Sequence, residues 1–498
     1  MDSIGIPEFY AGRDIFITGG TGFMGKILIE KLLRSCPDLN NIYILIRSRK
    51  GKTAEERWNE LTDLPVFDVL KAERPDALRT QVKVLEGDVR EEMLGLNAEH
   101  YKLLEDNVSV IFHAAATVRF NEPFSEAVQM NTYGTTQIVN LALNMKQLKV
   151  LVHVSTAYSN CQISEIEEKI YPPIADWKEV LKITEKVDPQ ALTILTDKYL
   201  NGLPNTYVFS KSLAEAIVWE VRDKIPLVIF RPTIVIASWK EPVPGWMDNV
   251  NGPVGMMIGS GKGIIRTVPC NEEAMADFTL VDCAIKAMII CAWKRATFPI
   301  SDDENIIYNC ATTYKNITNG EIHKMGLEII ERNPLEQILW YPQMKLHKNL
   351  TLFRLEAVYK HFLPALIIDA ILKILGKKTL VLKINTKIHV ALLALSYFLL
   401  GSWKFHNKNF MSLLDDIPNK DKEAFDFNFL NIEPLDYFEN CANKGGRKYL
   451  LKEGNLDKDK AKRNFLILKY LHYTMLTAFR ITLIWAAYKI YCSYTSDI

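Results

Sequence analysis

The stretch Asp14-Ile15-Phe16-Ile17-Thr18-Gly19-Gly20-Thr21-Gly22-Phe23-Met24-Gly25 decides the fold that the sequence predicts. Its apolar residues predict a short buried strand, its glycines a turn, and the residues from Phe23 onward a helix. Glycines at this spacing suit a dinucleotide-binding turn, because they allow a tight bend, the close approach of a pyrophosphate and close packing of helix on strand. The alternative is an ordinary glycine turn between a strand and a helix. In the dinucleotide interpretation the cofactor contacts are Thr18, Gly19, Thr21, Gly22, Phe23, Met24 and Gly25.

A basic run follows the second predicted strand, residues 41–46, and reads Arg47-Ser48-Arg49-Lys50. A site that prefers NAD usually places an acidic residue here to bind the ribose hydroxyl groups. A guanidinium instead suits the 2′-phosphate that distinguishes NADP(H). We therefore expect NADPH as the cofactor and place Arg47 at its 2′-phosphate, with a solvated charged loop as the alternative.

Further apolar runs at residues 82–85, 108–112, 149–154 and 227–230 predict strands that alternate with helices. This alternation is typical of right-handed βαβ units and a parallel sheet. Ligands bind such sheets at the carboxyl ends of the strands. We expect further cofactor contacts there and in the following helix, from Asp88, Val89, Ala114, Ala115, Asn131, Pro232 and Thr233.

Three residues form a candidate catalytic set. Ser155 directly follows the strand at 149–154, and Tyr207 and Lys211 are spaced to share one face of a helix. A phenol has a pKa near 10, and a neighbouring ammonium would lower that pKa toward working pH. Ser155 could then donate a hydrogen bond to a carbonyl oxygen, Tyr207 could protonate it, and Lys211 could also bind the nicotinamide ribose. The alternative for the Tyr207 and Lys211 pair is an ordinary pair on a helix surface.

The glycine turn together with the serine, tyrosine and lysine set resembles the extended short-chain dehydrogenases/reductases. Five further segments are similar to fatty acyl-CoA reductases. These segments are 245–253 (GWMDNVNGP), 259–263 (GSGKG), 276–282 (ADFTLVD), 401–405 (GSWKF) and 447–453 (RKYLLKE). The resemblance runs essentially from end to end. It implies a Rossmann-type, doubly wound α/β domain with the NADP(H) and catalytic site at residues 10–345, followed by a smaller, mostly helical domain at 346–460.

The resemblance also implies a reaction. A long-chain acyl-CoA would be reduced with NADPH to a primary fatty alcohol through an enzyme-bound aldehyde, with release of CoA. One rival is a membrane-bound dehydrogenase or epimerase that acts on a sterol or a sugar nucleotide, and another is a non-catalytic NADP-binding scaffold. The complete serine, tyrosine and lysine set argues against the scaffold, and the C-terminal segments argue against the sugar-nucleotide enzyme.

An apolar helix at residues 465–492, preceded by a basic cluster at 458–463, predicts an anchor in membrane lipid. Arg480 interrupts this helix, so two arrangements stay open, one that spans the bilayer and one that lies in its interface. Positive charge near a membrane helix tends to stay cytosolic. We therefore expect an endoplasmic reticulum membrane protein with a cytosolic active site, and the peroxisomal membrane is the alternative.

The composition narrows the range of partners. Lysine and arginine total 60 residues against 59 acidic ones, which gives no reason to expect a nucleic-acid partner. The eight cysteines are scattered without the spacing of a metal site, so no bound metal is predicted. The sequence indicates no particular oligomeric state.

Overall fold

The computed structural model describes residues 4–49, 51–298, 306–312, 317–453 and 458–496. The chain forms two compact units: unit 1 consists of Met1–Asp248, Met275–Ile317 and Ser402–Gly445, and unit 2 of Asn249–Ala274, Thr318–Gly401 and Gly446–Ile498. Each unit therefore combines segments that are far apart in the sequence, whereas the expected domains were continuous stretches. The functional assignment of those stretches stays a prediction.

Unit 1 is built on a seven-stranded parallel sheet with the order β11-β7-β5-β4-β1-β2-β3. The strands are β1 (Asp14–Thr18), β2 (Ile42–Ile46), β3 (Val82–Glu86), β4 (Val108–His113), β5 (Val150–Val154), β7 (Leu227–Pro232) and β11 (Ile307–Cys310). In this order the chain moves outward in both directions from β1 and β4, as in a doubly wound Rossmann-type sheet. The predicted parallel α/β fold is confirmed.

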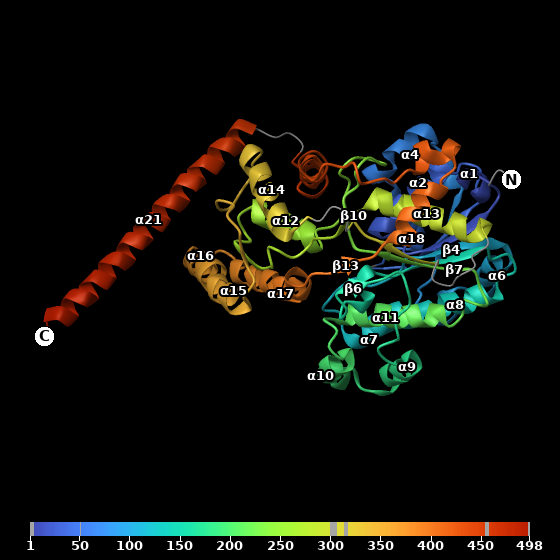
Figure 1. Cartoon of the computed structure of the whole chain (residues 1–498), viewed down its shortest axis with the longest axis horizontal. Coiled ribbons are helices and arrows are strands. Elements are labelled where there is room, and N and C mark those ends of the chain that lie inside the picture. Colours follow the sequence, from blue (N-terminus) through green and yellow to red (C-terminus); the bar gives the residue numbers. More distant parts are fainter. Residues whose placement is uncertain (1–3, 50, 299–305, 313–316, 454–457, 497–498) are drawn as a thin grey trace. The chain divides into compact units, whose positions relative to one another are not determined.

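Helices cover both faces of this sheet (Figure 1). One layer contains α2 (Phe23–Ser35) and α13 (Val281–Thr297), and the other contains α6 (Ala98–Asn107), α8 (Gly134–Asn144) and α11 (Thr206–Trp219). Every residue of β1, β2, β4, β5, β7 and β11 is accordingly buried, and only the edge strand β3 has exposed residues. Continuous apolar runs are what a sheet covered on both faces requires.

Shorter elements complete unit 1. Its other helices are α1 (Ile6–Tyr10), α3 (Ala54–Thr62), α4 (Asp68–Glu73), α5 (Ala77–Thr80), α7 (Phe124–Ala127), α9 (Trp177–Lys186), α10 (Pro189–Leu200), α18 (Lys408–Asp416), α19 (Lys422–Phe425) and α20 (Pro434–Asp436). Two small parallel pairs join β8 (Ile234–Ile236) to β10 (Phe278–Leu280) and β6 (Glu165–Ile166) to β13 (Lys404–Phe405).

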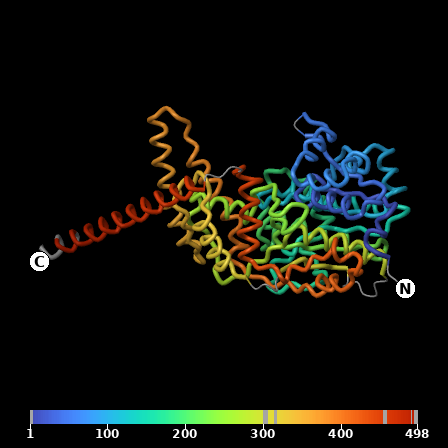
Figure 2. Tube along the Cα trace, turned by 90° about the horizontal axis from the view of Figure 1, so that it is seen from above, coloured from blue at the N-terminus to red at the C-terminus, as the bar shows by residue number. Residues whose placement is uncertain are grey.

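Unit 2 is mostly helical (Figure 2). It contains α12 (Gly252–Gly261), α14 (Asn319–Arg332), α15 (Leu350–Ala357), α16 (Leu363–Ile374), α17 (Val381–Leu400), α21 (Lys458–Ser496) and the parallel pair of β9 (Thr267–Pro269) with β12 (Lys345–His347). Its core packs Phe353 and Leu392 against Ile265 and Val268. A helical region near the C-terminus was expected and is confirmed.

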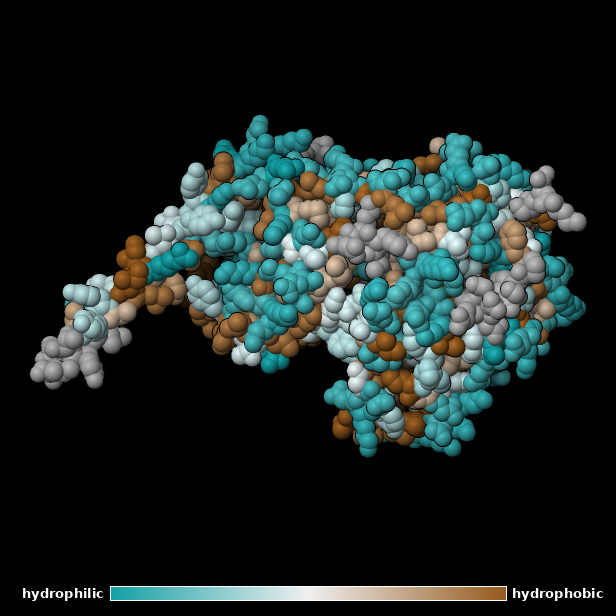
Figure 3. All heavy atoms as spheres, in the orientation of Figure 1, coloured by the Kyte–Doolittle hydropathy of each residue, from teal (hydrophilic) through white to brown (hydrophobic). Residues whose placement is uncertain are grey.

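The apolar helix expected at 465–492 lies within α21, but its beginning belongs to the core of unit 2. Phe465 is 5% exposed and packs with Leu335 and Ile338, and Lys469 forms a 2.6 Å ion pair with Glu331. The apolar surface that stays exposed therefore lies farther along α21 than Phe465 (Figure 3). Among the described residues, one helix is long and apolar enough to cross a membrane, and it is α17, with 6% of its apolar window buried.

Candidate active site

The glycine turn joins β1 to α2 and leaves no room for a side chain at two positions. Gly19 has φ +76°, and a Cβ there would lie 2.7 Å from the carbonyl carbon and oxygen of Ala114. A Cβ on Gly25 would lie 2.2 Å from the Gly19 carbonyl oxygen. Gly22 caps α2 without a side-chain hydrogen bond, so N–H groups at the start of α2 are available to an anion. The turn thus fits a dinucleotide pyrophosphate.

Thr18 ties the turn to the neighbouring strand. Its Oγ1 lies 2.7 Å from Nδ1 of His113 and accepts a hydrogen bond of 3.3 Å from the backbone N–H of Ala115. Burial lowers the pKa of His113 to about 3, so the ring is neutral at pH 7. The buried Thr18 hydroxyl therefore holds β1 against the end of β4, and a direct contact between Thr18 and a cofactor stays a prediction.

The three predicted catalytic residues meet at the carboxyl end of β5. Ser155 follows β5 directly, and its buried Oγ has no hydrogen-bond partner among the described residues. Lys211 on α11 donates from Nζ to the carbonyl oxygen of Val154, at 2.5 Å. Tyr207, one turn earlier, hydrogen-bonds with Thr156. The fold therefore gathers all three side chains around three consecutive residues, 154–156, and it leaves the serine donor free for a ligand.

Burial sets the protonation of this group. It raises the pKa of Tyr207 to about 12, against the opposing effect of the hydrogen bond with Thr156. This direction is opposite to the one expected from a neighbouring ammonium, because desolvation dominates and the Lys211 ammonium is bonded to a backbone carbonyl. Burial also lowers the pKa of Lys211 to about 8, although the charge of Glu215 counteracts it. At pH 7 the site holds a neutral phenol and a charged ammonium, which suits a proton donor.

Asn131 supports the helix that carries Tyr207 and Lys211. It lies in a π-helical segment, residues 128–133, a type of distortion often found at functional sites. Its Nδ2 donates to Oγ of Ser210 at 2.9 Å and to the carbonyl of Thr117 at 3.2 Å, and its Oδ1 accepts from the Thr117 N–H at 2.9 Å. Asn131 therefore positions α11, and the cofactor contact expected of it stays a prediction.

Arginines gather where the 2′-phosphate was expected. Arg57 on α3 donates from Nη1 to the backbone carbonyl of Arg47. Burial lowers the pKa of Arg57, and so do the positive charges of Arg47 and Arg49. This mutual repulsion is what an anion would relieve. The sequence analysis missed Arg57, although it lies in the first turn of the first helix after the basic run.

Asp88 and Val89 lie beside these arginines. Burial would raise the pKa of Asp88, but hydrogen bonds from Arg90 outweigh burial and the pKa is lowered. The Asp88 carboxylate accepts from Nη2 of Arg90 at 2.8 Å and lies 3.6 Å from Nη1 of Arg47. Val89 is buried in the core of the sheet domain. Asp88 therefore orients two arginines, and the adenine contact expected of it stays a prediction.

At the end of β7 the side chains bind protein groups. The Thr233 N–H donates to the Cys310 carbonyl at 3.0 Å, and its Oγ1 donates to Asp277 at 2.9 Å. Before Pro232 and Thr233, the fully buried Arg231 donates twice to the Glu215 carboxylate, at 2.8 and 2.7 Å. Because Glu215 lies one turn after Lys211, this pair fixes α11 against the sheet. The sequence analysis missed it, since nothing local marks an arginine in a buried strand as paired.

A loop at residues 239–248 covers the glycine turn, and the sequence analysis used this segment only for its resemblance. Trp246 stacks on Phe23 with ring centroids 5.4 Å apart. Asp248 Oδ2 pairs at 2.5 Å with Lys26, whose Nζ also donates to the Thr21 carbonyl at 3.2 Å. The loop thus holds the turn that a pyrophosphate would contact.

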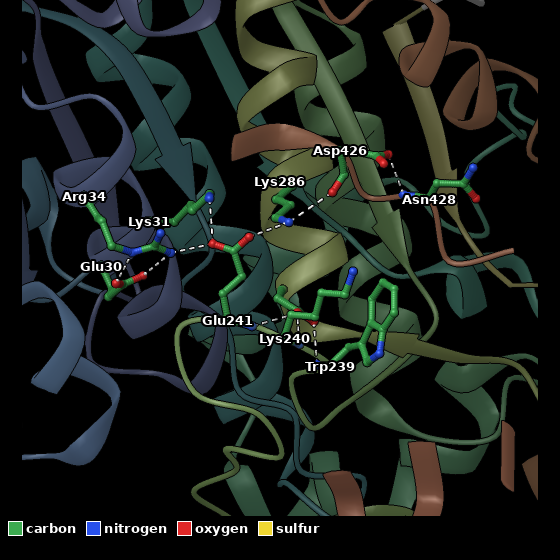
Figure 4. Close-up of polar contacts among 10 residues, drawn as sticks. Glu30, Lys31, Arg34, Trp239, Lys240, Glu241, Lys286, Asp426 and Asn428 are labelled. Atoms are coloured by element: carbon green, nitrogen blue, oxygen red, sulfur yellow. Dashed lines mark hydrogen bonds and ion pairs between the residues drawn. The ribbon is translucent and has the colours of Figure 1, made fainter. Parts of the chain in front are cut away.

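The base of this loop is held by a buried charge network (Figure 4). The Glu241 carboxylate pairs with Lys31 at 2.7 Å and with Arg34 and Lys286 at 2.5 Å each. Burial would raise the pKa of Glu241, but these cations outweigh burial and lower the pKa to about 2. Asp282 adds a second clamp, because its carboxylate accepts from the backbone N–H groups of residues 239, 240 and 241.

Comparisons with known proteins agree with this geometry. The family described as "Male sterility protein" matches residues 17–288 with its NAD-binding part and residues 360–453 with its Sterile part. Fatty acyl-CoA reductase 1 of Xenopus laevis is 38% identical, over 97% of this chain and 93% of that protein. The human protein of the same name is 37% identical over the same shares.

A further relative and a solved structure are also similar to this chain. Fatty acyl-CoA reductase wat of Drosophila melanogaster is 36% identical, over 98% of this chain and 94% of that protein. Among solved structures, the terminal R domain from the myxalamid PKS-NRPS biosynthetic pathway is similar in fold, with a TM-score of 0.59 at 18% identity, over 90% of this chain and 93% of that one. The curated relatives therefore match both the nucleotide-binding sheet and the C-terminal region.

Proposed function

Because the chain belongs to the fatty acyl-CoA reductase family, we propose that it reduces long-chain acyl-CoA to a primary fatty alcohol with NADPH, through an enzyme-bound aldehyde. The observation that carries the proposal is the free, buried Ser155 hydroxyl beside Tyr207 and Lys211. A buried donor without a partner is costly to the protein unless a ligand uses it. A substrate carbonyl oxygen is such a ligand.

Each residue has a defined task in the reaction. Bound NADPH supplies the hydride that adds to the carbonyl carbon. Ser155 donates a hydrogen bond to the carbonyl oxygen, which gains negative charge as the hydride arrives. Tyr207 transfers its proton to that oxygen, and the Lys211 ammonium stabilises the phenolate that remains.

The substrate is reduced twice at these groups, first as the thioester and then as the aldehyde. The first addition produces a hemithioacetal, whose C–S bond breaks as its hydroxyl proton leaves, releasing CoA as the thiol and an aldehyde. The aldehyde carbonyl then occupies the same position. A second NADPH would supply the second hydride, and Tyr207, once reprotonated from solvent, would supply the second proton to produce the alcohol. One donor set serves both steps, because each step develops negative charge on one oxygen.

The choice of NADPH over NADH is supported by the arginines after β2. Arg47 and Arg49 already lower the pKa of Arg57, so an added phosphate dianion would be attracted by all three. Arg47 is 41% exposed in its side chain, which leaves it accessible to a ligand.

A membrane location is supported by α21. From Met475 onward it exposes Met475, Phe479, Ile481, Leu483, Ile484 and Trp485. We place the protein at the endoplasmic reticulum membrane with its active site in the cytosol, and the peroxisomal membrane is the alternative. Fractionating cells that express the chain truncated before Lys458, beside the full chain, tests this location. If both forms stay soluble, α21 is not an anchor.

Product analysis tests the activity. Membranes with the full chain would be incubated with acyl-CoAs of increasing length and with NADPH or NADH, and the lipids would be separated. We expect fatty alcohol with NADPH, and a trace of aldehyde when a carbonyl-trapping reagent is present. Absence of any reduced lipid, in a protein that still binds NADPH, would favour the scaffold. Oxidation or epimerisation of an added sterol or sugar nucleotide would favour the other rival.

A further inference from the structure

The helices α16 and α17 of unit 2 form a hairpin with an exposed apolar face. Leu363, Ile367, Ile371 and Ile374 follow one another at helical spacing and share one side of α16, and each is between 47% and 85% exposed. Figure 3 shows apolar side chains gathered over α15 and α16, and Figure 2 shows the hairpin as a two-helix projection. Contiguous apolar surface of this kind marks a docking site.

The same hairpin is strongly basic. Within residues 363–400 its lysines are Lys373, Lys377, Lys378, Lys383 and Lys387. All five are exposed, and none forms an ion pair with another described residue. The one acidic residue of the hairpin, Asp369, accepts from the N–H groups of Val381 and Leu382, at 3.1 and 2.9 Å, and so caps α17. The surface therefore combines apolar residues with positive charge that no ion pair with a described residue neutralises.

We propose that the α16–α17 hairpin docks on an anionic lipid surface, with its long side flat in the interface. Interfacial helices combine these features, with apolar residues at the boundary of the acyl chains and lysines that reach the headgroups. Although α17 is long enough to cross a membrane, the 12 residues of α16 extend about 18 Å, which is less than the roughly 30 Å of a bilayer core, so the two helices cannot cross it as a pair. Insertion by the tip is also unfavourable, because it would carry the lysines of the turn into hydrocarbon.

A lipid surface fits this hairpin better than a second copy of the chain. Two copies meeting at this face would bring the same five lysines together, and like charges oppose such a contact. The hairpin also lies beside the other apolar surface of unit 2. Tyr359, just before α16, contacts Phe479 of α21 with ring centroids 5.8 Å apart. One bilayer could therefore receive both elements.

Amide hydrogen exchange of the full chain tests the docking. The protein would be compared without vesicles, with phosphatidylcholine vesicles, and with vesicles that also contain phosphatidylserine. We expect exchange in residues 363–387 to slow by about tenfold, and only with the anionic vesicles, because each lysine near such a surface strengthens binding by about fivefold. Unchanged exchange in this segment, even if α21 holds the protein on the vesicles, overturns the proposal.

Matched variants separate the hairpin from overall charge. The triple change Lys373→Glu, Lys377→Glu and Lys378→Glu should abolish the protection. The triple change Lys182→Glu, Lys186→Glu and Lys198→Glu, on exposed positions of α9 and α10, alters the net charge equally and should preserve it. If the two triple variants behave alike, the hairpin is not a specific docking surface.

The apolar face has its own test. Ile367→Gln with Ile371→Gln removes exposed side chains, so the protein should fold and bind NADPH as before while the protection by anionic vesicles is lost. Protection that instead appears without vesicles, and increases with protein concentration, would assign the face to a second copy and overturn the lipid proposal. Docking of α16 and α17 is compatible with either arrangement of α21, across the bilayer or in its interface.

Discussion

Two lysines of unit 1 are both buried, but they differ in the groups that their ammonium ions contact. Burial lowers the pKa of Lys211 at the end of β5 and of Lys31 on α2. Lys31 pairs with the Glu241 carboxylate at 2.7 Å, within a network that also contains Glu30, Arg34 and Lys286 (Figure 4). Lys211 instead donates to a backbone carbonyl, beside a serine hydroxyl without a partner among the described residues. Paired charge stabilises a buried loop, whereas a buried charge without a carboxylate partner among the described residues is a candidate for binding a ligand.

The largest effect should follow from Tyr207→Phe. It removes the proton donor from the catalytic edge and should lower turnover by about two to four orders of magnitude, with NADPH binding nearly unchanged. The free energy of unfolding should change little, because this site contributes chemistry and little stability. Product formation and cofactor titration measure both effects, and Tyr199→Phe, whose ring packs on Phe124, is the control. Substantial turnover in the Tyr207→Phe protein would show that the Lys211 site does not differ from the Glu241 network by carrying the proton donor.

In the charge network around Glu241, a substitution should instead have its main effect on the free energy of unfolding. Glu241→Gln leaves Lys31 and Lys286 buried without their carboxylate and should lower the free energy of unfolding by about 3–5 kcal/mol. The pKa of Glu241 is about 2, below the unfolded value of about 4.3, so its stabilisation is present above pH 4.3 and is lost as pH falls toward 2. Denaturant titrations at several pH values measure this contribution.

A matched exposed pair provides the control for Glu241. Glu60 pairs with Lys52 at the surface, so Glu60→Gln should cost less than about 1 kcal/mol. If Glu241→Gln is equally mild, the network is not what stabilises the loop over the glycine turn.

A smaller effect concerns cofactor choice. Arg47→Asp removes one charge-assisted hydrogen bond to the 2′-phosphate, worth about 1.5–3 kcal/mol, and should weaken NADPH by about one to two decades. Binding of NADH, which lacks the phosphate, should change far less. Equilibrium titration of both cofactors measures this difference. A wild-type protein that prefers NADH would contradict our interpretation of the arginine cluster.

The smallest effect is a pH dependence of activity that follows from the buried Lys211. The pKa of Lys211 is about 8, so kcat/KM should fall above pH 8, by up to tenfold per pH unit, as the ammonium is lost. Its contribution to stability should move in the opposite direction. The folded pKa lies below the unfolded value of about 10.4, so the buried charge destabilises the fold below pH 8 and this cost fades as pH rises toward 10.4. Activity that stays constant from pH 7 to 9.5 would contradict the role of Lys211.

The sequence by itself determined the sheet and brought together the candidate catalytic groups. Glycine spacing, apolar runs and the four-residue interval from Tyr207 to Lys211 are local features, and parallel sheets bring strand ends together in a known way. Ser155, Tyr207 and Lys211 could therefore be placed at one edge before any coordinates. Gly19 and Gly25 were predicted for the same reason, since a close approach of backbone to backbone excludes every other residue there.

Only the tertiary structure decided how the buried charges are paired and which surfaces stay exposed. Glu215 meets Arg231 and Glu241 meets Lys31 across long sequence intervals, and no local pattern marks such pairs. The pKa of Tyr207 moves up where a neighbouring ammonium predicted a fall, because the extent of desolvation depends on every segment that covers the ring. The apolar runs near Ile371 and Phe465 look alike in sequence, yet Phe465 is buried and Ile371 faces outward, since burial is set by the elements packed against each helix.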